Sequence, residues 1–386
     1  MKLNNQFFLV GFSEFFSKAL AWLTLAIIPI FSAPEIYGKI VLYYSIIIFL
    51  IPLFLFGQDR LILRNDANLE INRSLVFSFF ILLFLSPFLI YFNYFLLALV
   101  SFILALNKIY LTYLRSAEKI KSYACNRIIY SSLRFFVVII VIYFFYTDSN
   151  YIFAEFAAGL MATIYMLIMV FKNGISFDVE WKERFFHGFP LMLHGLSIFG
   201  IALIDRFILQ YFTDLKTVGN YSFLYIFASG LIFLYSIIGI VMEKKIYKSN
   251  TNMELFKNIK STFIYMFILG LFGSIVSVIL YVIITNFNIV NGYAYLPGEL
   301  LLLLLAHLFL PIYLVSNYFL IQKGKNNLLM YSTFLSLLVN FLTNIIFIPL
   351  YGLIGAVYAT LLSNLILCSI ISFISYNVFK VSDESR

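Results

Sequence analysis

Residues 262–285 read TFIYMFILGLFGSIVSVILYVIIT, which is 24 residues without a charged side chain. About 20 consecutive apolar residues are enough for one helix to cross the hydrocarbon core of a bilayer, because each residue adds about 1.5 Å to its length. In water, so long an apolar segment would have to be covered on all sides by other protein. The stretch therefore predicts a membrane-spanning helix.

The rest of the chain has the same character. Of its 386 residues, 63% are hydrophobic and 11% are charged, whereas typical soluble proteins have about 45–50% and about 25%. A chain with so few charges could not cover a water-soluble surface, and one with so many apolar residues would not stay disordered. The composition predicts an integral membrane protein of the all-α class.

Pro, Gly and charged clusters divide the sequence into twelve apolar stretches of spanning length. The stretches cover residues 7–31, 37–57, 74–92, 94–114, 128–147, 151–171, 188–212, 219–242, 262–285, 298–321, 328–348 and 353–376. We therefore expect about twelve transmembrane helices. The first stretch is too long for the core of a signal peptide and contains Glu14 and Lys18, so it is predicted to be a span.

Positive charge is distributed unevenly among the segments that connect these stretches. With the N-terminus in the cytoplasm, twenty of the 26 Lys and Arg residues fall in cytoplasmic segments, five fall within spans, and one, Lys216, falls outside. Membrane proteins keep Lys and Arg on the cytoplasmic side. Both termini are therefore predicted to be cytoplasmic, and this topology accounts for the net charge of +8 without a nucleic-acid partner.

Several function classes lack their motifs in this sequence. No connecting segment is long enough for an ATP-hydrolysing domain, and there is no G-x-x-x-x-G-K-[ST] loop to bind a nucleotide phosphate. The three histidines, His187, His194 and His307, have no zinc-ligand spacing, and two cysteines cannot build a disulfide framework. We therefore predict no catalytic residue, no metal and no cofactor.

The two halves of the chain repeat one short pattern. Gly38 lies beside a tyrosine where the second span begins, and Gly219 lies two residues before a tyrosine where the eighth span begins. Because six spans is an even number, both halves would enter the membrane in the same direction, related by a pseudo-two-fold axis along the membrane normal. The predicted organisation is an N-terminal six-helix bundle at 1–172, a cytoplasmic linker at 173–187 and a C-terminal six-helix bundle at 188–386.

The last two spans carry the most specific motif. Residues 348–360 read IPLYGLIGAVYAT and contain the pattern P-x-x-G-x-x-G-A-x-x-A-T. Small residues at spacings of three and four make a stripe on which another helix can pack closely. The motif resembles the start of the last helix in the polysaccharide-flippase branch of the multidrug/oligosaccharidyl-lipid/polysaccharide exporter (MOP) superfamily. The segments at 57–60, 205–209 and 218–222 are also similar to that family.

The resemblance implies two six-helix bundles around a V-shaped cavity that opens alternately to each side of the bacterial inner membrane. The implied substrate is an oligosaccharide linked to an isoprenoid (undecaprenyl) diphosphate, moved from the inner to the outer leaflet for assembly of a surface polysaccharide such as O-antigen. Membrane lipid and a polysaccharide polymerase are the implied partners. A diphosphate carries about two negative charges, and hydrocarbon does not tolerate bare charge, so the cavity must be hydrated and basic.

Lys18 is the deepest of the basic residues that fall within spans. It lies about eleven residues into the first span, or roughly 16 Å, so neither membrane surface is within reach of its side chain. Glu14 is one turn earlier on the same face of the helix. Two interpretations stay open: a self-neutralised acid–base pair, and a diphosphate-binding lysine that Glu14 holds in place when the cavity is empty.

Four other basic residues are expected to contact the diphosphate: Lys39, Lys108 and Arg134 in the N-terminal half and Arg206 in the C-terminal half. Lys108 and Arg134 are also near enough to the inner ends of their spans to snorkel into water. Asp205 adjoins Arg206, and because neighbours on a helix point about 100° apart, we expect the two to find separate partners. Glu155 begins the sixth span, where a solvated position at the outer surface is expected.

Two other functions are compatible with twelve spans. A cation-coupled exporter of small amphipathic drugs, from the same superfamily, would need a cavity centred on a carboxylate, whereas the deep acid Glu14 has a basic neighbour. A polytopic membrane enzyme acting on lipid-linked glycans would need a nucleophile, a metal or paired carboxylates, and the sequence shows no such constellation. We therefore favour a flippase, which is a secondary-type transporter and not an enzyme.

The charge asymmetry predicts the side of each loop. A reporter enzyme that works only outside the cytoplasm should be active when it is fused after Asn150 and inactive when it is fused after Asn250, because most Lys and Arg residues stay in the cytoplasm. The opposite result at either position would contradict the predicted topology.

Overall fold

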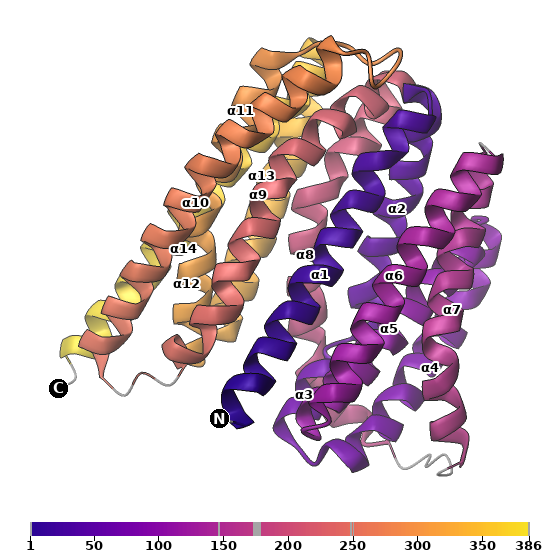
Figure 1. Ribbon diagram of the computed structural model, residues 1–386. Helices are drawn as coiled ribbons and strands as arrows, with labels where there is room; N and C mark the ends of the chain where they lie inside the picture. The colour runs from indigo at the N-terminus through magenta and orange to yellow at the C-terminus, as the bar shows by residue number, and fades with distance from the viewer. Residues whose placement is uncertain (1, 146, 173–178, 248, 250, 385–386) are drawn as a thin grey trace. The chain divides into compact units, whose positions relative to one another are not determined.

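The computed structural model describes residues 2–145, 147–172, 179–247, 249 and 251–384. Every regular element in these ranges is a helix (Figure 1). The helices are α1 (Lys2–Phe31), α2 (Pro34–Leu55), α3 (Gln58–Arg64), α4 (Ala67–Tyr91), α5 (Phe95–Ser116), α6 (Ile120–Phe145), α7 (Asp148–Lys172), α8 (Trp181–Phe212), α9 (Leu215–Tyr247), α10 (Asn252–Asn286), α11 (Pro297–Leu308), α12 (Leu310–Gln322), α13 (Asn326–Tyr351) and α14 (Leu353–Glu384). The prediction of an all-α protein is confirmed.

Eleven segments of the described chain are long and apolar enough to cross a membrane. The predicted span at 151–171 coincides with α7, which has 25 residues, so about twelve spans is consistent with the structure. The predicted span at 298–321 is divided into α11 and α12. Pro311 lies in the first turn of α12 and has no N–H to continue the hydrogen bonds of α11, which explains the break.

Glycines end two of the helices and explain the motif at 348–360. Gly57 separates α2 from α3 and Gly352 separates α13 from α14, with φ of 71° and 59°, a conformation that glycine adopts without steric strain. Gly355 lies in the first turn of α14, where a Cβ would collide with the carbonyl oxygen of Phe347 in α13. The second glycine of the motif therefore allows α14 to return close to α13.

Contacts between residues divide the chain into two compact units. Unit 1 comprises Met1–Ser32 and Lys39–Phe199, and unit 2 comprises Ala33–Gly38 and Gly200–Arg386. Helices α2 and α8 each contribute to both units. The linker predicted at 173–187 stays a prediction, and its residues 173–178 lie outside the described residues.

The two units repeat one order of helix contacts. In unit 1, α4 packs against α5, α5 against α7, and α6 against α7 (Figure 1). In unit 2, α10 packs against α12, α12 against α14, and α13 against α14. These helices hold equivalent places in the two halves of the sequence when α11 and α12 count as one span. The structure thus supports two repeated helical bundles.

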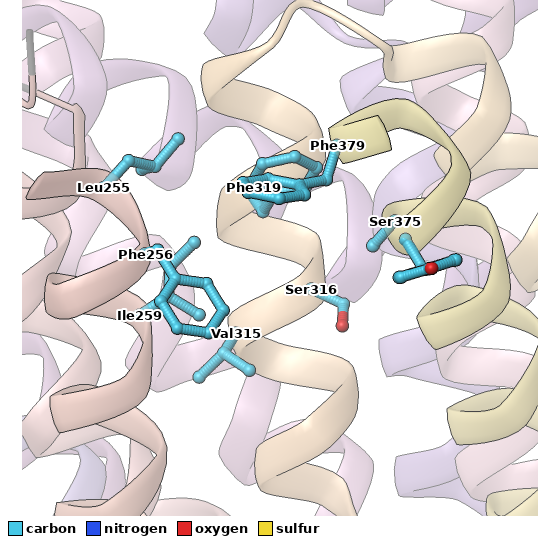
Figure 2. Close-up of a pocket in the computed structure, with 9 residues that line it drawn as sticks. Leu255, Phe256, Ile259, Val315, Ser316, Phe319, Ser375 and Phe379 are labelled. Atoms are coloured by element: carbon cyan, nitrogen blue, oxygen red, sulfur yellow. The ribbon is translucent and has the colours of Figure 1, made fainter. Parts of the chain in front are cut away.

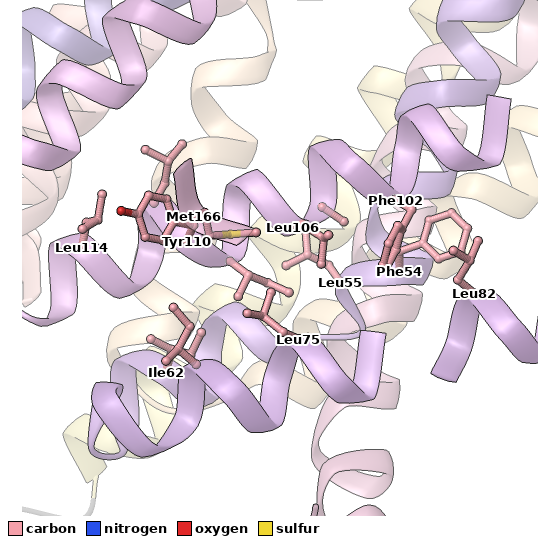
Figure 3. Close-up of a cluster of buried hydrophobic side chains, with 14 of the residues drawn as sticks. Phe54, Leu55, Ile62, Leu75, Leu82, Phe102, Leu106, Tyr110, Leu114 and Met166 are labelled. Atoms are coloured by element: carbon pink, nitrogen blue, oxygen red, sulfur yellow. The ribbon is translucent and has the colours of Figure 1, made fainter. Parts of the chain in front are cut away.

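Unit 1 has a core of large apolar side chains (Figure 3). Phe54 of α2 meets Phe102 of α5 edge to face, with ring centroids 5.9 Å apart. Tyr110 of α5 and Met166 of α7 belong to the same buried cluster. Because lipid is as apolar as these side chains, close van der Waals contact stabilises the bundle more than removal from water does.

The two glycines of the sequence repeat lie against each other within unit 2. A Cβ on Gly38 would collide with the carbonyl oxygen of Leu215 and would lie 2.9 Å from the Gly219 backbone nitrogen. A Cβ on Gly219 would collide with the carbonyl oxygen of Pro34. The start of α2 therefore meets the start of α9 backbone to backbone, an approach that requires residues without a side chain.

Replacing Gly38 or Gly219 by valine should destabilise the protein by at least about 1–3 kcal/mol, which is typical of overpacking, because backbone atoms cannot rotate aside as side chains do. Gly11→Val is the matched control, since no atom beyond its own turn of helix lies within 4 Å of the Cβ position at Gly11. Thermal unfolding of the purified protein in detergent measures the difference. Equal stability of the three variants would contradict the close approach.

Candidate functional site

A half-exposed charged cluster joins α1 to α6 in unit 1. Glu14 of α1 accepts a hydrogen bond from the Tyr123 hydroxyl of α6. It also forms an ion pair with Arg127 of α6, whose Nε is 3.0 Å from Glu14 Oε1. Lys18 lies one turn further along α1, with its Nζ 3.9 Å from Glu14 Oε2. We refer to Glu14, Lys18, Tyr123 and Arg127 as the Glu14 cluster.

The Glu14 cluster has more positive than negative charge. Lys18 and Arg127 bring two cations to one carboxylate, so the net charge is +1. Lys18 keeps 35% of its side chain exposed and Arg127 keeps 24%. Both cations are therefore partly accessible at the surface of unit 1.

Hydroxyl groups hold the two helices in register at the Glu14 cluster. The Ser17 hydroxyl of α1 donates to the carbonyl oxygen of Arg127 at 3.0 Å. The Ser131 hydroxyl of α6 donates to the Ser17 hydroxyl at 2.9 Å. Ser17 is three residues after Glu14 and Ser131 is four residues after Arg127, so these bonds fix which residues of α6 lie opposite Glu14.

The predicted pair of Glu14 and Lys18 is present, but Arg127 makes the closer contact with the carboxylate. The sequence analysis had assigned Arg127 to a cytoplasmic segment, whereas it lies within α6. Polar residues at Tyr123, Arg127 and Ser131 recur every four residues on this helix. A polar stripe at helical spacing on an otherwise apolar span is the signal that could have revealed Arg127.

Arg134 of α6 is buried and fully paired. Its guanidinium donates three hydrogen bonds of 2.7–2.9 Å to the Glu155 carboxylate of α7. Tyr151 donates a fourth bond to Glu155 at 2.7 Å. The two side chains are 9% and 2% exposed, so the expectation of a solvated Glu155 is wrong, and Arg134 does not snorkel. Close pairing with the guanidinium cation makes burial of this carboxylate tolerable.

Lys108 and Lys39 are the other basic residues predicted for the N-terminal half. Lys108 is exposed on α5, and its Nζ is 3.7 Å from Asp59 Oδ2 of α3. Lys39 is half-buried on α2, with its Nζ 6.0 Å from the centroid of the Tyr43 ring. The contacts of Lys39, Lys108 and Arg134 with a diphosphate stay predictions.

Asp205 and Arg206 of α8 form a buried pair in unit 2. Arg206 Nη1 is 3.0 Å from Asp205 Oδ1 and donates to the Ala202 carbonyl oxygen at 2.6 Å. The expectation of separate partners is wrong here, because the long arginine side chain folds back over the preceding turn of its own helix. Tyr221 of α9 donates to Asp205 and lies 3.0 Å from the Thr360 hydroxyl of α14. The pair therefore ties three helices together.

Aromatic rings enclose the Arg206 guanidinium. Its central carbon is 4.4 Å from the centroid of the Tyr225 ring, which meets the His307 ring edge to face with centroids 5.2 Å apart. His307 Nδ1 is 2.8 Å from the carbonyl oxygen of Leu303. Arg206 and His307 are both buried, so this network is shielded from a ligand in this structure, and the diphosphate contact of Arg206 stays a prediction.

A second buried network lies where α8 begins in unit 1. Arg184 of α8 donates to Gln58 of α3 at 2.6 Å and forms an ion pair with Glu70 of α4. Arg73 of α4 pairs with Glu180 at 3.1 Å. The sequence analysis counted these residues only as cytoplasmic charge, because their pairing depends on segments more than 100 residues apart. They fix the first turns of α8 on α3 and α4.

Charge balance separates the Glu14 cluster from the other networks. The pairs Arg134–Glu155 and Arg206–Asp205 each match one cation to one carboxylate inside the protein. In the network at the start of α8, two arginines are matched by two carboxylates, which are Arg184, Arg73, Glu70 and Glu180. In the described part of the chain, no group of three or more His, Cys, Asp or Glu side chains could hold a metal ion. The Glu14 cluster is therefore the candidate site, with the chemistry of an anion-binding site.

The fold of the chain is similar to that of solved transporters. An inward-facing multidrug resistance MATE family transporter of the MOP superfamily matches with a TM-score of 0.72 and 12% identity, covering 94% of this chain and 95% of that one. An outward-facing MATE family transporter of the same superfamily matches with a TM-score of 0.64 and 13% identity, covering 99% and 97%. No protein-family model and no curated protein matches the sequence.

A MOP superfamily transporter from Pyrococcus furiosus, whose reverse polarity of the binding pocket suggests a different function, matches with a TM-score of 0.61 and 13% identity. The match covers 97% of this chain and 95% of that one. At identities this low, the likeness shows the fold alone. The chain has the fold of MATE transporters of the MOP superfamily, as the sequence motif implied.

Replacing only one partner of the Arg134–Glu155 pair should lower the stability of the protein more than replacing both partners. Arg134→Leu leaves Glu155 buried and unmatched, which should cost about 3–5 kcal/mol of stability, whereas Arg134→Leu with Glu155→Leu should recover most of that loss. Chemical unfolding in detergent micelles measures the two variants and the wild type. A double variant no more stable than the single one would show that the pair is not an isolated structural contact.

Proposed function

We propose that the protein is a flippase that moves an isoprenoid diphosphate-linked oligosaccharide from the inner to the outer leaflet by alternating access. The fold of known transporters supports a transport function, and the net positive charge of the Glu14 cluster supports an anionic substrate. The proposed setting is the bacterial inner membrane, where the product would serve assembly of a surface polysaccharide and a polymerase would act on it. The Glu14 cluster is the observation that carries the proposal.

The position of Lys18 deep within the apolar part of α1 supports a functional role for the charge of the Glu14 cluster. The apolar part of α1 extends from Leu9 to Phe31, so Lys18 lies roughly 14 Å and 20 Å from its two ends at 1.5 Å per residue. A cation at this depth persists only when it faces protein or a hydrated cavity. The partial exposure of Lys18 and Arg127 in unit 1 favours a hydrated surface.

Glu14 acts as an internal counter-ion that a substrate can replace. A diphosphate carries about two negative charges, which match the two cations that share Glu14. The Arg127 guanidinium can bind two phosphate oxygens at once, and Lys18 adds a point charge. Tyr123 supplies a hydroxyl donor that serves the carboxylate now and would serve a phosphate oxygen in its place.

The membrane potential supplies a driving force for such a substrate. Moving two negative charges outward across an inside-negative membrane of 100 mV is favourable by about 4.6 kcal/mol, at about 2.3 kcal/mol for each charge. Export against a moderate gradient therefore needs no ATP-hydrolysing domain. A carboxylate that binds a coupling ion is not required either.

A multidrug exporter is the second candidate, because solved structures with this fold include multidrug resistance transporters. An amphipathic cation would meet a net positive charge at the Glu14 cluster, where Arg127 already occupies the carboxylate. In the MOP superfamily transporter from Pyrococcus furiosus, which has a similar fold, the reverse polarity of the binding pocket suggests a different function. Polarity of the site therefore favours the anionic substrate here.

Removing the cations of the Glu14 cluster should abolish export without unfolding the protein. Lys18→Ala and Arg127→Ala should each reduce export at least tenfold, because each removes a charge-assisted contact of about 1.5–3 kcal/mol. Lys18→Arg should keep partial activity, and Glu14→Gln should be milder than Lys18→Ala. The assay is complementation of surface polysaccharide in a strain that lacks its own flippase, with abundance in the membrane measured beside it.

Two controls make the result specific to the Glu14 cluster. Lys121→Gln removes one exposed positive charge from the same helix as Arg127 and should leave export unchanged. Lys182→Gln removes one exposed positive charge from α8 in the same unit and should also leave export unchanged. Normal export by a protein with Glu14→Leu, Lys18→Met and Arg127→Met would overturn the proposed site, whereas export of cationic dyes that depends on Glu14 would favour the multidrug function.

A further inference from the structure

A cavity of about 170 Å³ lies between α10, α12 and α14, which are helices of unit 2, whereas the Glu14 cluster belongs to unit 1. Figure 2 shows Leu255, Phe256 and Ile259 of α10 on one side of α12 and Ser375 of α14 on the other, with Phe379 of α14 beside Phe319. The lining residues are Leu255, Phe256, Ile259, Val315, Ser316, Phe319, Ser375, Tyr376 and Phe379. The lining is almost wholly apolar and includes four aromatic rings.

Each of the three helices carries a lysine one turn after an aromatic lining residue. Phe256 is followed by Lys260 on α10, Phe319 is followed by Lys323 after α12, and Tyr376 is followed by Lys380 on α14. Residues four apart lie on the same face of a helix. Helix α10 runs antiparallel to α12 and α14, because the start of α10 meets the end of α12. Lys260 therefore lies one turn from the aromatic rings in one direction along the bundle, and Lys323 and Lys380 lie one turn in the other, so positive charge flanks the cavity from both sides.

The three lysines differ in their surroundings. Lys260 and Lys380 are exposed. Lys323 is half-buried, and its Nζ donates to Asn252 Oδ1 at 2.8 Å, which joins the end of α12 to the start of α10. Glu254, the acid in the first turn of α10, points about 120° away from Lys260 around the helix axis. The charge on the face of α10 that lines the cavity is therefore positive.

Helix length places the cavity at the membrane interface. Helix α10 has 35 residues, or about 52 Å, whereas the hydrocarbon core is about 30 Å thick. About 11 Å of the helix therefore extends beyond the core at each end. Lys260 is eight residues, or about 12 Å, after the first residue of α10. In the predicted topology this end of the bundle faces the cytoplasm.

We propose that this cavity binds an anionic phospholipid of the inner leaflet, with part of an acyl chain between α10, α12 and α14 and the phosphate against Lys260, Lys323 and Lys380. Basic pockets between helices on the cytoplasmic side of membrane proteins suit anionic headgroups, and a layer of such lipids surrounds the protein there. Phe256 and Tyr376 are exposed at the cavity, so the remainder of the chain can lie along their rings.

The dimensions of the cavity favour a lipid chain over the glycan substrate. An apolar cavity of about 150 Å³ holds a benzene-sized group and stays free of water. A cavity of this size therefore accepts a few methylene groups and rejects an oligosaccharide. Three separate lysines also suit the phosphate of an abundant bilayer lipid that exchanges freely with its surroundings, so we commit to a phospholipid over an isoprenoid chain.

The experiment uses the full-length protein in nanodiscs of phosphatidylcholine with a small fraction of photoreactive phosphatidylglycerol, whose acyl chain carries the reactive group. We expect cross-links to peptides of α10, α12 and α14, and stronger labelling than with photoreactive phosphatidylcholine. Replacing Lys260, Lys323 and Lys380 together by glutamine should weaken binding roughly a hundredfold, at roughly fivefold for each lysine. Titration with unlabelled phosphatidylglycerol as competitor measures the affinity.

Two further variants separate binding from folding. Ser316→Phe fills the cavity and should abolish labelling, while thermal unfolding without anionic lipid shows that the protein is folded. A matched triple variant, Lys119→Gln, Lys121→Gln and Lys182→Gln, removes three exposed charges from unit 1 and should keep wild-type labelling.

Three results would overturn the proposal. They are equal labelling by the two phospholipids, unchanged affinity in the variant with all three cavity lysines replaced, and labelling of the cavity by a photoreactive isoprenyl diphosphate in preference to phosphatidylglycerol. The assay involves neither transport nor the residues of the Glu14 cluster. Its outcome is therefore independent of the proposed flippase function.

Discussion

Charge that leaves water for a bilayer must find its partner inside the protein, and this constraint organises the structure. Arg134 pairs with Glu155, Arg206 with Asp205, and Arg184 with Glu70. Each of these networks also joins helices within one unit. Arg134–Glu155 and Arg184–Glu70 do so through the ion pair itself, and the Arg206–Asp205 pair does so through Tyr221. Apolar side chains alone could not specify these contacts, because lipid offers them an equally favourable environment.

The Glu14 cluster differs because its charges do not cancel. Two partly exposed cations share one carboxylate within the apolar segments of α1 and α6, and an excess of charge in a membrane span is costly unless a partner compensates it. The matched pairs balance their charge within the protein. In the function proposed above, a substrate anion would complete the charge balance of the Glu14 cluster.

Small residues allow the backbones of neighbouring helices to approach each other closely. Gly38 and Gly219 meet where α2 and α9 begin, and Gly355 lets α14 lie against α13. Because glycine has no side chain, the helix backbones can touch at these points. Within lipid, the hydrophobic effect would not drive such a contact. Where the helices instead leave a cavity, between α10, α12 and α14, aromatic side chains line it. Lipid does not drive apolar side chains together as water does. Both the close backbone contacts and the cavity are compatible with that property of the bilayer.

The sequence by itself determined the membrane class, about twelve spans, the expected side of each loop and the repeat marked by Gly38 and Gly219, because these depend on length, composition and spacing along one helix. Its P-x-x-G-x-x-G-A motif also implied the fold. Tertiary structure alone decided the partners of the charges. Glu14 meets Arg127 across 113 positions, and a pairing between helices depends on their register and rotation, which no single helix carries in its own periodicity.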